Sequence, residues 1–229
     1  MATFILIPGA GGNAFYWSLV VPMLEQAGHV AVAVDLPGDD AAAGLPEYVD
    51  LTLRAIGAHE RVILVAQSLG GFTAAMTGAR AAHKLGMLVL VNAMIPLPGE
   101  TAGAYWGHVD TDGAQLAAAE EHGYAKEFSV ETYFLHDVPE EVFRAPGADP
   151  RPEADIVFSQ PCAFERWPAL PLHVLAGADD RFFPLALQER VARERLGLPI
   201  DAISGGHLVA LSNPHGVAEK LLTYQRSLV

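Results

Sequence analysis

Short apolar runs rich in β-branched residues alternate along the chain with longer stretches of helical periodicity. The runs are apolar at consecutive positions and end at turn residues, as strands buried on both faces of a sheet do: Thr3–Ile7, Val30–Val34, Arg61–Ala66, Met87–Asn92, Pro171–Ala176 and Pro199–Ile203. Helical patterns lie between or after them at Tyr16–Ala27, Pro46–Ala58, Leu69–His83, Pro184–Leu196 and Asn213–Gln225. Because such alternation requires right-handed crossovers, it predicts an α/β fold, a mostly parallel sheet of about six strands with helices on both faces.

One segment, from about Glu100 to Trp167, interrupts this alternation. It contains irregular helical stretches, proline and glycine breaks and no pair of strand patterns. The length of 229 residues fits one domain with an insertion better than two domains. We therefore predict a core formed by residues 1–99 and 168–229, with residues 100–167 as a helical cap over one edge of the sheet.

Composition excludes several classes of protein. Hydrophobic residues make up 51% of the chain and charged residues 18%, which excludes intrinsic disorder. No apolar run approaches the roughly 20 residues of a membrane span, so we expect no membrane partner. The run Phe4–Ile7 is too short for the core of an export signal, and the single Cys162 cannot form an intrachain disulfide. We expect a cytoplasmic protein, with the oligomeric state open and a homodimer as one option.

Charge is strongly acidic and unevenly distributed. The net charge is −13, so the chain lacks the clustered cations that nucleic-acid binding needs. Residues 100–155 alone hold 13 acids and 3 bases, a net −10. The acidity therefore belongs mainly to the predicted cap, where we expect it to disfavour anionic substrates.

The first strand–helix turn contains a glycine pattern with two interpretations. Gly9, Gly11 and Ala14 match the loose dinucleotide-binding fingerprint, and Asp35 ends the second strand where a ribose contact would lie. A nicotinamide-dependent oxidoreductase is therefore one hypothesis. A short-chain dehydrogenase would also supply Tyr-x-x-x-Lys, and none of the six tyrosines has a lysine four residues later. The absence of this pair argues against the oxidoreductase.

A second glycine-rich turn connects the third strand directly to a helix. Ser68 lies there between Ala66 and Gly70, both small, as the sharp turn of a nucleophile elbow requires. The competing interpretation is an ordinary serine N-cap. A serine nucleophile needs a histidine base and an acid that orients it. Asp180 and His207 follow the fifth and sixth strands, at the sheet edge where ligands bind.

Other residues could take these partner roles. Asp179 is the alternative acid, although its spacing from Gly177 favours Asp180 over it. Among the nine histidines, His136 of the insertion is the one most able to line the site from above. Most of the other histidines fall near helix ends, in the insertion or within a strand pattern.

Together these motifs resemble the α/β-hydrolase superfamily over nearly the whole chain. The resemblance rests on Ile5–Ala10, Trp17, Ala66–Gly71, Gly177–Asp180 and Gly205–His207. The branch it most resembles is the small-capped one of plant methyl-ester esterases and hydroxynitrile lyases, whose cap is similar to Tyr133–Asp137.

The resemblance implies a role for each matching residue. Ser68 would be the nucleophile, His207 the base and Asp180 its orienting acid. The backbone N–H groups of Ala10 and Leu69 would form the oxyanion hole. The family's usual His-Gly is here Pro8-Gly9, and its usual Gly-His-Ser is Ala66-Gln67-Ser68. The first departure leaves Gly11 as an alternative donor.

We expect a serine hydrolase that cleaves a small, neutral, apolar or aromatic carboxylic ester through an acyl-enzyme. The lyases of this branch place a lysine after the catalytic histidine and a threonine in the oxyanion loop, where this chain has Leu208 and Gly9. A non-catalytic small-molecule receptor is the alternative of another class. No metal or organic cofactor is expected. Candidate pocket residues are Gly9, Trp17, Tyr105, Trp106, Phe128, Tyr133, Phe134 and Phe158.

Overall fold

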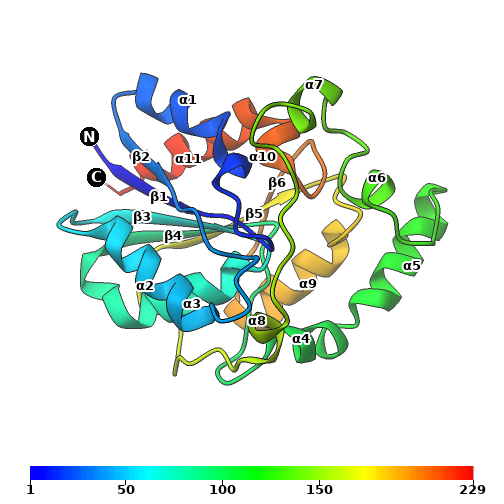
Figure 1. Ribbon diagram of the computed structural model, residues 1–229, viewed down its shortest axis with the longest axis horizontal. Coiled ribbons are helices and arrows are strands. Elements are labelled where there is room, and N and C mark those ends of the chain that lie inside the picture. Colours follow the sequence, from blue (N-terminus) through cyan, green and yellow to red (C-terminus); the bar gives the residue numbers. More distant parts are fainter. Residues whose placement is uncertain (229) are drawn as a thin grey trace.

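The computed structural model describes residues 1–228. Its sheet has six strands in the order β2-β1-β3-β4-β5-β6, and every neighbouring pair is parallel (Figure 1). The strands are β1 Thr3–Ile7, β2 Val30–Ala33, β3 Val62–Gln67, β4 Leu85–Val91, β5 Leu172–Gly177 and β6 Asp201–Ile203. The predicted α/β fold with about six parallel strands is confirmed.

Helices cover both faces of the sheet. Alternate residues of β1 show this division, because Ile5 and Ile7 belong to one apolar core and Phe4 and Leu6 to the other. The first core includes α2 Leu45–Ile56, α3 Gly70–Ala81 and α9 Leu185–Leu196, and the second includes α1 Val20–Gln26 and α11 Pro214–Arg226. Within residues 1–228, no helix combines the length and the apolar character needed to cross a bilayer.

Some boundaries differ from the predicted ones where a proline intervenes. The stretch predicted as one helix, Tyr16–Ala27, forms a short 3-10 turn η1 at Ala14–Trp17 and then α1. Because proline is accepted in the first turn of a helix, where its missing N–H is not needed, α1 starts shortly before Pro22. The last strand begins after Pro199, which has no N–H to donate to the sheet. Neither difference changes the topology.

The chain leaves the sheet between β4 and β5. Residues 92–171 contain α4 Ala102–His108, α5 Thr111–His122, α6 Val130–Tyr133, α7 Glu140–Phe143 and α8 Asp155–Ser159. One isolated antiparallel bridge joins Thr101 to Pro161, near the two ends of this excursion. In Figure 1 these helices lie beyond the edge at which the strands end. They fall within the predicted cap, whose boundaries at residues 100 and 167 stay a prediction.

A buried ion pair attaches the start of the insertion to α9. Arg195 Nη2 donates to Glu100 Oε1 at 3.0 Å, and Arg195 Nη1 donates to the Ile95 carbonyl at 2.7 Å. The Glu100 side chain is only 3% exposed. Burial alone would raise the pKa of Glu100, but hydrogen bonds from Arg195, His108 and the Leu97 N–H together hold that pKa below its ordinary value.

Replacing Glu100 with alanine is expected to lower the free energy of unfolding by about 3–5 kcal/mol, because Arg195 would remain buried without a counter-charge. Chemical denaturation measures this loss. Glu120→Ala is the matched control, since Glu120 pairs with Lys126 at the surface and its removal should cost about 1 kcal/mol or less.

The same pair predicts a pH dependence. Because the folded pKa of Glu100 lies below its ordinary value, its stabilising contribution is present above that ordinary value and is lost as pH falls through the folded pKa. The stability difference between wild type and Glu100→Ala should therefore shrink in acid. A variant as stable as wild type at neutral pH would contradict the assignment.

Candidate active site

The turn from β3 into α3 is so tight that Ser68 adopts a left-handed backbone conformation, with φ of +50°. A Cβ on Gly70 would lie 2.5 Å from the Pro8 carbonyl oxygen, and one on Gly71 would meet the Met94 carbonyl oxygen still more closely. The small residues predicted after the serine therefore have a steric cause. The turn leaves Ser68 at the carboxyl end of the sheet, 7% exposed.

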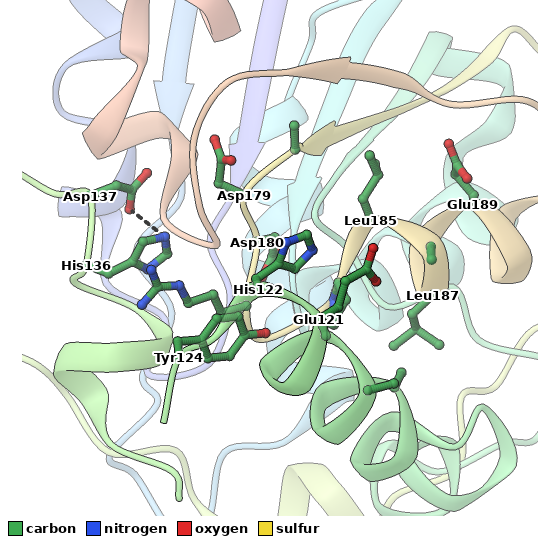
Figure 2. Close-up of a pocket in the computed structure, with 17 residues that line it drawn as sticks. Glu121, His122, Tyr124, His136, Asp137, Asp179, Asp180, Leu185, Leu187 and Glu189 are labelled. Carbon is green, nitrogen blue, oxygen red and sulfur yellow. Dashed lines mark ion pairs between the residues drawn. The ribbon is translucent and has the colours of Figure 1, made fainter. Parts of the chain in front are cut away.

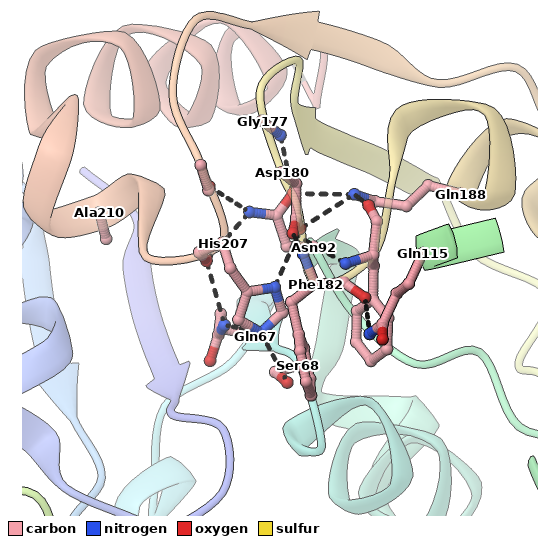
Figure 3. A network of polar contacts seen from close by, with 12 residues as sticks. Gln67, Ser68, Asn92, Gln115, Gly177, Asp180, Phe182, Gln188, His207 and Ala210 are labelled. Carbon is pink, nitrogen blue, oxygen red and sulfur yellow. Dashed lines mark hydrogen bonds and ion pairs between the residues drawn. The ribbon is translucent and has the colours of Figure 1, made fainter. Parts of the chain in front are cut away.

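Asp180, His207 and Ser68 form one hydrogen-bonded chain (Figure 3). Ser68 Oγ lies 3.1 Å from His207 Nε2, and His207 Nδ1 lies 2.9 Å from Asp180 Oδ2. All three are buried, and they follow β3, β5 and β6, whose carboxyl ends share one edge of the sheet. The structure thus brings together the three residues predicted as nucleophile, base and acid.

The Asp180 carboxylate is held on both of its oxygens. Oδ1 accepts hydrogen bonds from the N–H groups of Phe182 and Phe183, both at 2.8 Å. Gln188 Nε2 donates to Oδ2 at 3.2 Å. These donors stabilise the carboxylate and direct Oδ2 toward His207.

Two buried amide side chains for which the sequence motifs predict no role hold the loop that carries His207. Asn92 Nδ2 donates to the carbonyl oxygens of Gly206 at 2.9 Å and His207 at 3.1 Å, while its Oδ1 accepts from the Gly177 N–H at 2.7 Å. Gln67 Nε2 lies 3.2 Å from His207 Nε2. These contacts join segments far apart in the sequence. The sequence offered one hint for Asn92, which is a polar residue at the end of a predicted strand. That strand is β4, the neighbour of the strand that ends before Ser68.

The turn after β1 lies directly beside Ser68. In the part of the chain that the structure describes, the N–H groups of Ala10 and Leu69 have no protein acceptor. The Gly11 N–H, by contrast, donates to Glu153 Oε2 at 2.7 Å. Of the two alternative donors in this turn, Ala10 is therefore the one whose N–H is available to a ligand.

Glu153 of the insertion braces this turn from outside. Its Oε2 accepts the Gly11 N–H, and its Oε1 accepts the Tyr48 hydroxyl at 2.5 Å. Burial raises the pKa of Glu153, and these two donors oppose that rise. Asp35, which a dinucleotide would need for its ribose, is paired with Arg151 at 3.3 Å. A carboxylate beside Gly11 would repel a pyrophosphate, so this arrangement disfavours the dinucleotide hypothesis.

If the site hydrolyses esters as the sequence predicts, Glu153→Gln should reduce kcat, because a neutral amide with one oxygen replaces the carboxylate, the charge-assisted hydrogen bonds from Gly11 and Tyr48 are lost, and the turn that carries Ala10 is loosened. The loss should stay below the ~10²–10³-fold that removal of an oxyanion donor costs. Steady-state hydrolysis of a neutral ester measures the effect, with Glu141→Gln on the exposed surface of α7 as the control. Equal activity of wild type and Glu153→Gln would refute the bracing role.

An apolar cavity of about 350 Å³ opens beside this turn and is lined in part by Gly9, Ala10 and Gln67. Its apolar walls include Phe15, Tyr16, Phe134, Leu135, Phe143 and Leu208. The ring of Phe134 also lies 5.1 Å from the ring of His207. A molecule in this cavity would therefore lie against Ala10 and against Phe134, whose ring packs on that of His207.

The residues predicted as pocket walls occupy different places. Gly9 and Phe134 line the cavity, whereas Trp17, Tyr105 and Tyr133 are buried in the protein interior and Phe128 and Phe158 are exposed. Trp106 contacts Phe182 and Phe183, with ring centroids 5.2 Å and 5.6 Å away. Several walls come instead from the turn after β1 and from α10 Val209–Ser212 with its preceding residue. The concentration of aromatic rings in the insertion gave no indication of these wall residues.

A second, larger cavity of about 640 Å³ lies on the far side of Asp180, between α5 and α9 (Figure 2). His136 faces it beside Asp137, 3.9 Å away, and burial lowers the pKa of His136. Asp179, the alternative acid, is exposed here and accepts the Gly205 N–H at 3.1 Å. Within residues 1–228, no group of three or more His, Cys, Asp or Glu side chains is placed to hold a metal ion.

Comparison with protein families agrees with this geometry. Residues 4–220 match the model of the alpha/beta hydrolase family. The chain belongs to the alpha/beta hydrolase family. Ser68, Asp180 and His207 follow one another in the chain order that this family uses for its serine, acid and histidine.

Curated relatives of this alpha/beta hydrolase include plant enzymes. It is 32% identical to norfluorocurarine synthase 1 from Strychnos sp over 103 residues, which cover 41% of this chain and 39% of the relative. It is 34% identical to methyl jasmonate esterase 1 from Vitis vinifera over 109 residues (42% and 40%). It is 35% identical to alpha-hydroxynitrile lyase from Arabidopsis thaliana over 107 residues (41% and 40%). The chain thus matches about two-fifths of the length of these relatives.

Among solved structures, polyneuridine aldehyde esterase superposes on this hydrolase with a TM-score of 0.78. The alignment covers 98% of this chain and 99% of that chain, at 19% identity. At that identity the likeness establishes the shared fold alone.

Proposed function

We propose that the protein is a carboxylic ester hydrolase that works through an acyl-enzyme on Ser68. The observation that carries this proposal is the unbroken hydrogen-bonded chain from Asp180 through His207 to Ser68. The free N–H groups of Ala10 and Leu69 support it, since an oxyanion needs donors that no protein acceptor occupies. Esterases among the relatives agree with it.

Acylation proceeds in two steps. Ser68 Oγ attacks the ester carbonyl carbon, and its proton passes to His207 Nε2. The carbonyl oxygen becomes an oxyanion that accepts hydrogen bonds from Ala10 and Leu69. When this intermediate collapses, the bond to the alkoxy oxygen breaks and His207 returns the proton to the departing alcohol. Asp180 stabilises the imidazolium that forms and takes no proton from it.

Deacylation repeats these steps with water. His207 takes a proton from water, and the hydroxide attacks the acyl carbon bound to Ser68. The same two N–H groups stabilise the second oxyanion. Collapse breaks the bond to Ser68 Oγ, which recovers its proton from His207, and the carboxylic acid leaves. The proton that Ser68 loses leaves with the alcohol and is replaced by one from water, so Ser68 and His207 end the cycle in their starting protonation states.

We further propose that the substrate is a small neutral ester with an apolar or aromatic group. The apolar walls of the 350 Å³ cavity support this class, because Phe15, Phe134 and Phe143 offer contact area without charge. The cation of that cavity, Arg151, is paired with Asp35 and so is not free for a substrate carboxylate. The net negative charge of residues 100–155 also disfavours an anionic substrate.

Two other activities are less well supported. Cyanohydrin cleavage would need a cation beside the histidine to stabilise departing cyanide, and Leu208 at that position is apolar and lines the cavity. A non-catalytic small-molecule receptor could keep this fold and even these three residues, so their hydrogen bonds do not separate a receptor from an enzyme. Turnover separates the receptor from the enzyme, because a receptor would release at most trace product.

A panel of aryl and alkyl esters of graded acyl length tests the proposed function. We expect turnover of short and aromatic neutral esters and a decline for long acyl chains that exceed the cavity. An anionic ester should react more slowly than its neutral analogue, and the difference should widen at low salt. Equal or faster hydrolysis of the anionic ester would contradict the substrate class. No turnover of any ester would contradict the enzyme.

A further inference from the structure

Gln67 is a buried polar residue that the proposed acyl-enzyme cycle does not use. It ends β3 immediately before Ser68 and is 3% exposed. Its Nε2 lies 3.2 Å from His207 Nε2 and 3.4 Å from the His207 carbonyl oxygen. Ser68 Oγ lies 3.1 Å from the same ring nitrogen (Figure 3). Two potential donors therefore converge on one lone pair of the imidazole.

The His207 carbonyl determines the orientation of this amide. A carbonyl oxygen only accepts, so the Gln67 atom that faces it must be the nitrogen, with its two hydrogens. One hydrogen then serves the carbonyl and the other points to the ring nitrogen. Oε1 lies over Gly9, where a Cβ would overlap it. Glycine at this position leaves the space that the amide occupies.

We propose that Gln67 is a positioning residue that holds His207 as the neutral imidazole whose Nε2 can accept the Ser68 proton. The inference rests on the proposed ester hydrolysis. A donor at Nε2 stabilises the ring with its proton on Nδ1, toward Asp180, and opposes protonation at Nε2. Once His207 has taken the Ser68 proton, two N–H groups face each other. This repulsion makes His207 a weaker base toward Ser68 and a stronger acid toward the leaving alcohol.

Removal of the amide need not unfold the site. The His207 carbonyl retains the Asn92 Nδ2 donor at 3.1 Å, so no buried acceptor is left unsatisfied there. The other titratable groups around the ring are Asp180 at Nδ1, His136 and Asp137 against Gly206, and Tyr16 beneath Ala210. Phe134, Phe182 and Phe183 supply the uncharged rings against it. These titratable groups and aromatic rings are the same in wild type and in each Gln67 variant.

The test is the pH profile of kcat/KM for a neutral ester in wild type and Gln67→Met, which has a similar length and no donor. The acid-side half-maximum should move to higher pH by about half a unit to one unit, the value of one net hydrogen bond to the neutral ring. Gln160→Met is the matched control, because that amide accepts from the Leu45 N–H away from Ser68. Its profile should coincide with that of wild type.

Gln67→Glu is the second variant, and it serves as the test of the inference if Gln67→Met does not fold. A carboxylate beside Nε2 accepts a proton that the amide cannot, so the acid-side half-maximum should rise further and kcat should fall. Thermal unfolding establishes that each variant is folded. An acid limb at the wild-type pH in a folded Gln67→Met or Gln67→Glu overturns the inference.

Ser68→Ala, measured alongside, separates the two proposals. If it keeps its activity, the proposed function is wrong, whatever the Gln67 profiles show. If it is inactive and the Gln67 variants keep the wild-type acid limb, only the role of Gln67 is wrong.

Discussion

Ser68→Ala is expected to lower kcat for neutral esters by roughly 10⁴–10⁶-fold. The reason is chemical, since no other hydroxyl is hydrogen-bonded to His207 Nε2 among residues 1–228. A residual rate above that in water should remain, because Ala10 and Leu69 can still stabilise an oxyanion formed by attack of water.

The fold should tolerate this change. Ser68 already adopts a φ of +50°, and alanine meets the same backbone strain as serine there. The unfolding midpoint should therefore stay close to that of wild type. Ser159→Ala, on the exposed surface of α8, is the control and should keep full activity. A folded Ser68→Ala enzyme within tenfold of wild type would place the nucleophile elsewhere.

Asp180→Asn is expected to lower kcat by about 10⁴-fold with little change in geometry. The N–H groups of Phe182 and Phe183 require an acceptor where Oδ1 now lies, so the asparagine oxygen takes that place. Its NH₂ group then faces His207 Nδ1 and donates to it. The ring proton is displaced to Nε2, where it blocks transfer from Ser68.

Asp179→Asn is the matched control for this prediction. Asp179 precedes Asp180 directly and accepts one backbone N–H, from Gly205, but its side chain is exposed. Its replacement should cost at most a few-fold in kcat. A pH profile of each variant adds a second readout, since the wrong tautomer lowers the rate across the whole neutral range. If Asp179→Asn proves inactive and Asp180→Asn active, the acid is Asp179.

The fold could be predicted because its information is local. Strands such as β1 and β3 are apolar at successive positions, and only a sheet covered on both faces buries such runs completely. The triad was accessible for a related reason, since Ser68, Asp180 and His207 each follow a strand and parallel strands end at one edge. Element order thus determined which distant residues meet.

The supporting groups could not be predicted because they depend on long-range side-chain contacts. Gln67 and His207 are 140 positions apart, and Glu153 and Gly11 are 142 apart. Neither contact produces a periodic pattern of residues in the sequence. The rings of the insertion show the same limit, because composition located them over the site but did not distinguish Phe134 at the cavity from Tyr133 in the interior.

The central claim is that a covalent intermediate forms on Ser68, and trapping that intermediate tests it most directly. A neutral aryl carbamate transfers a carbamoyl group that hydrolyses far more slowly than an ester, so the modified enzyme can be isolated. Intact-mass spectrometry and peptide mapping should find one carbamoyl group per chain, on the peptide that contains Ser68, with loss of esterase activity in proportion. Ser68→Ala should stay unmodified. A label on another residue, or an unlabelled enzyme that still hydrolyses esters, would contradict the account.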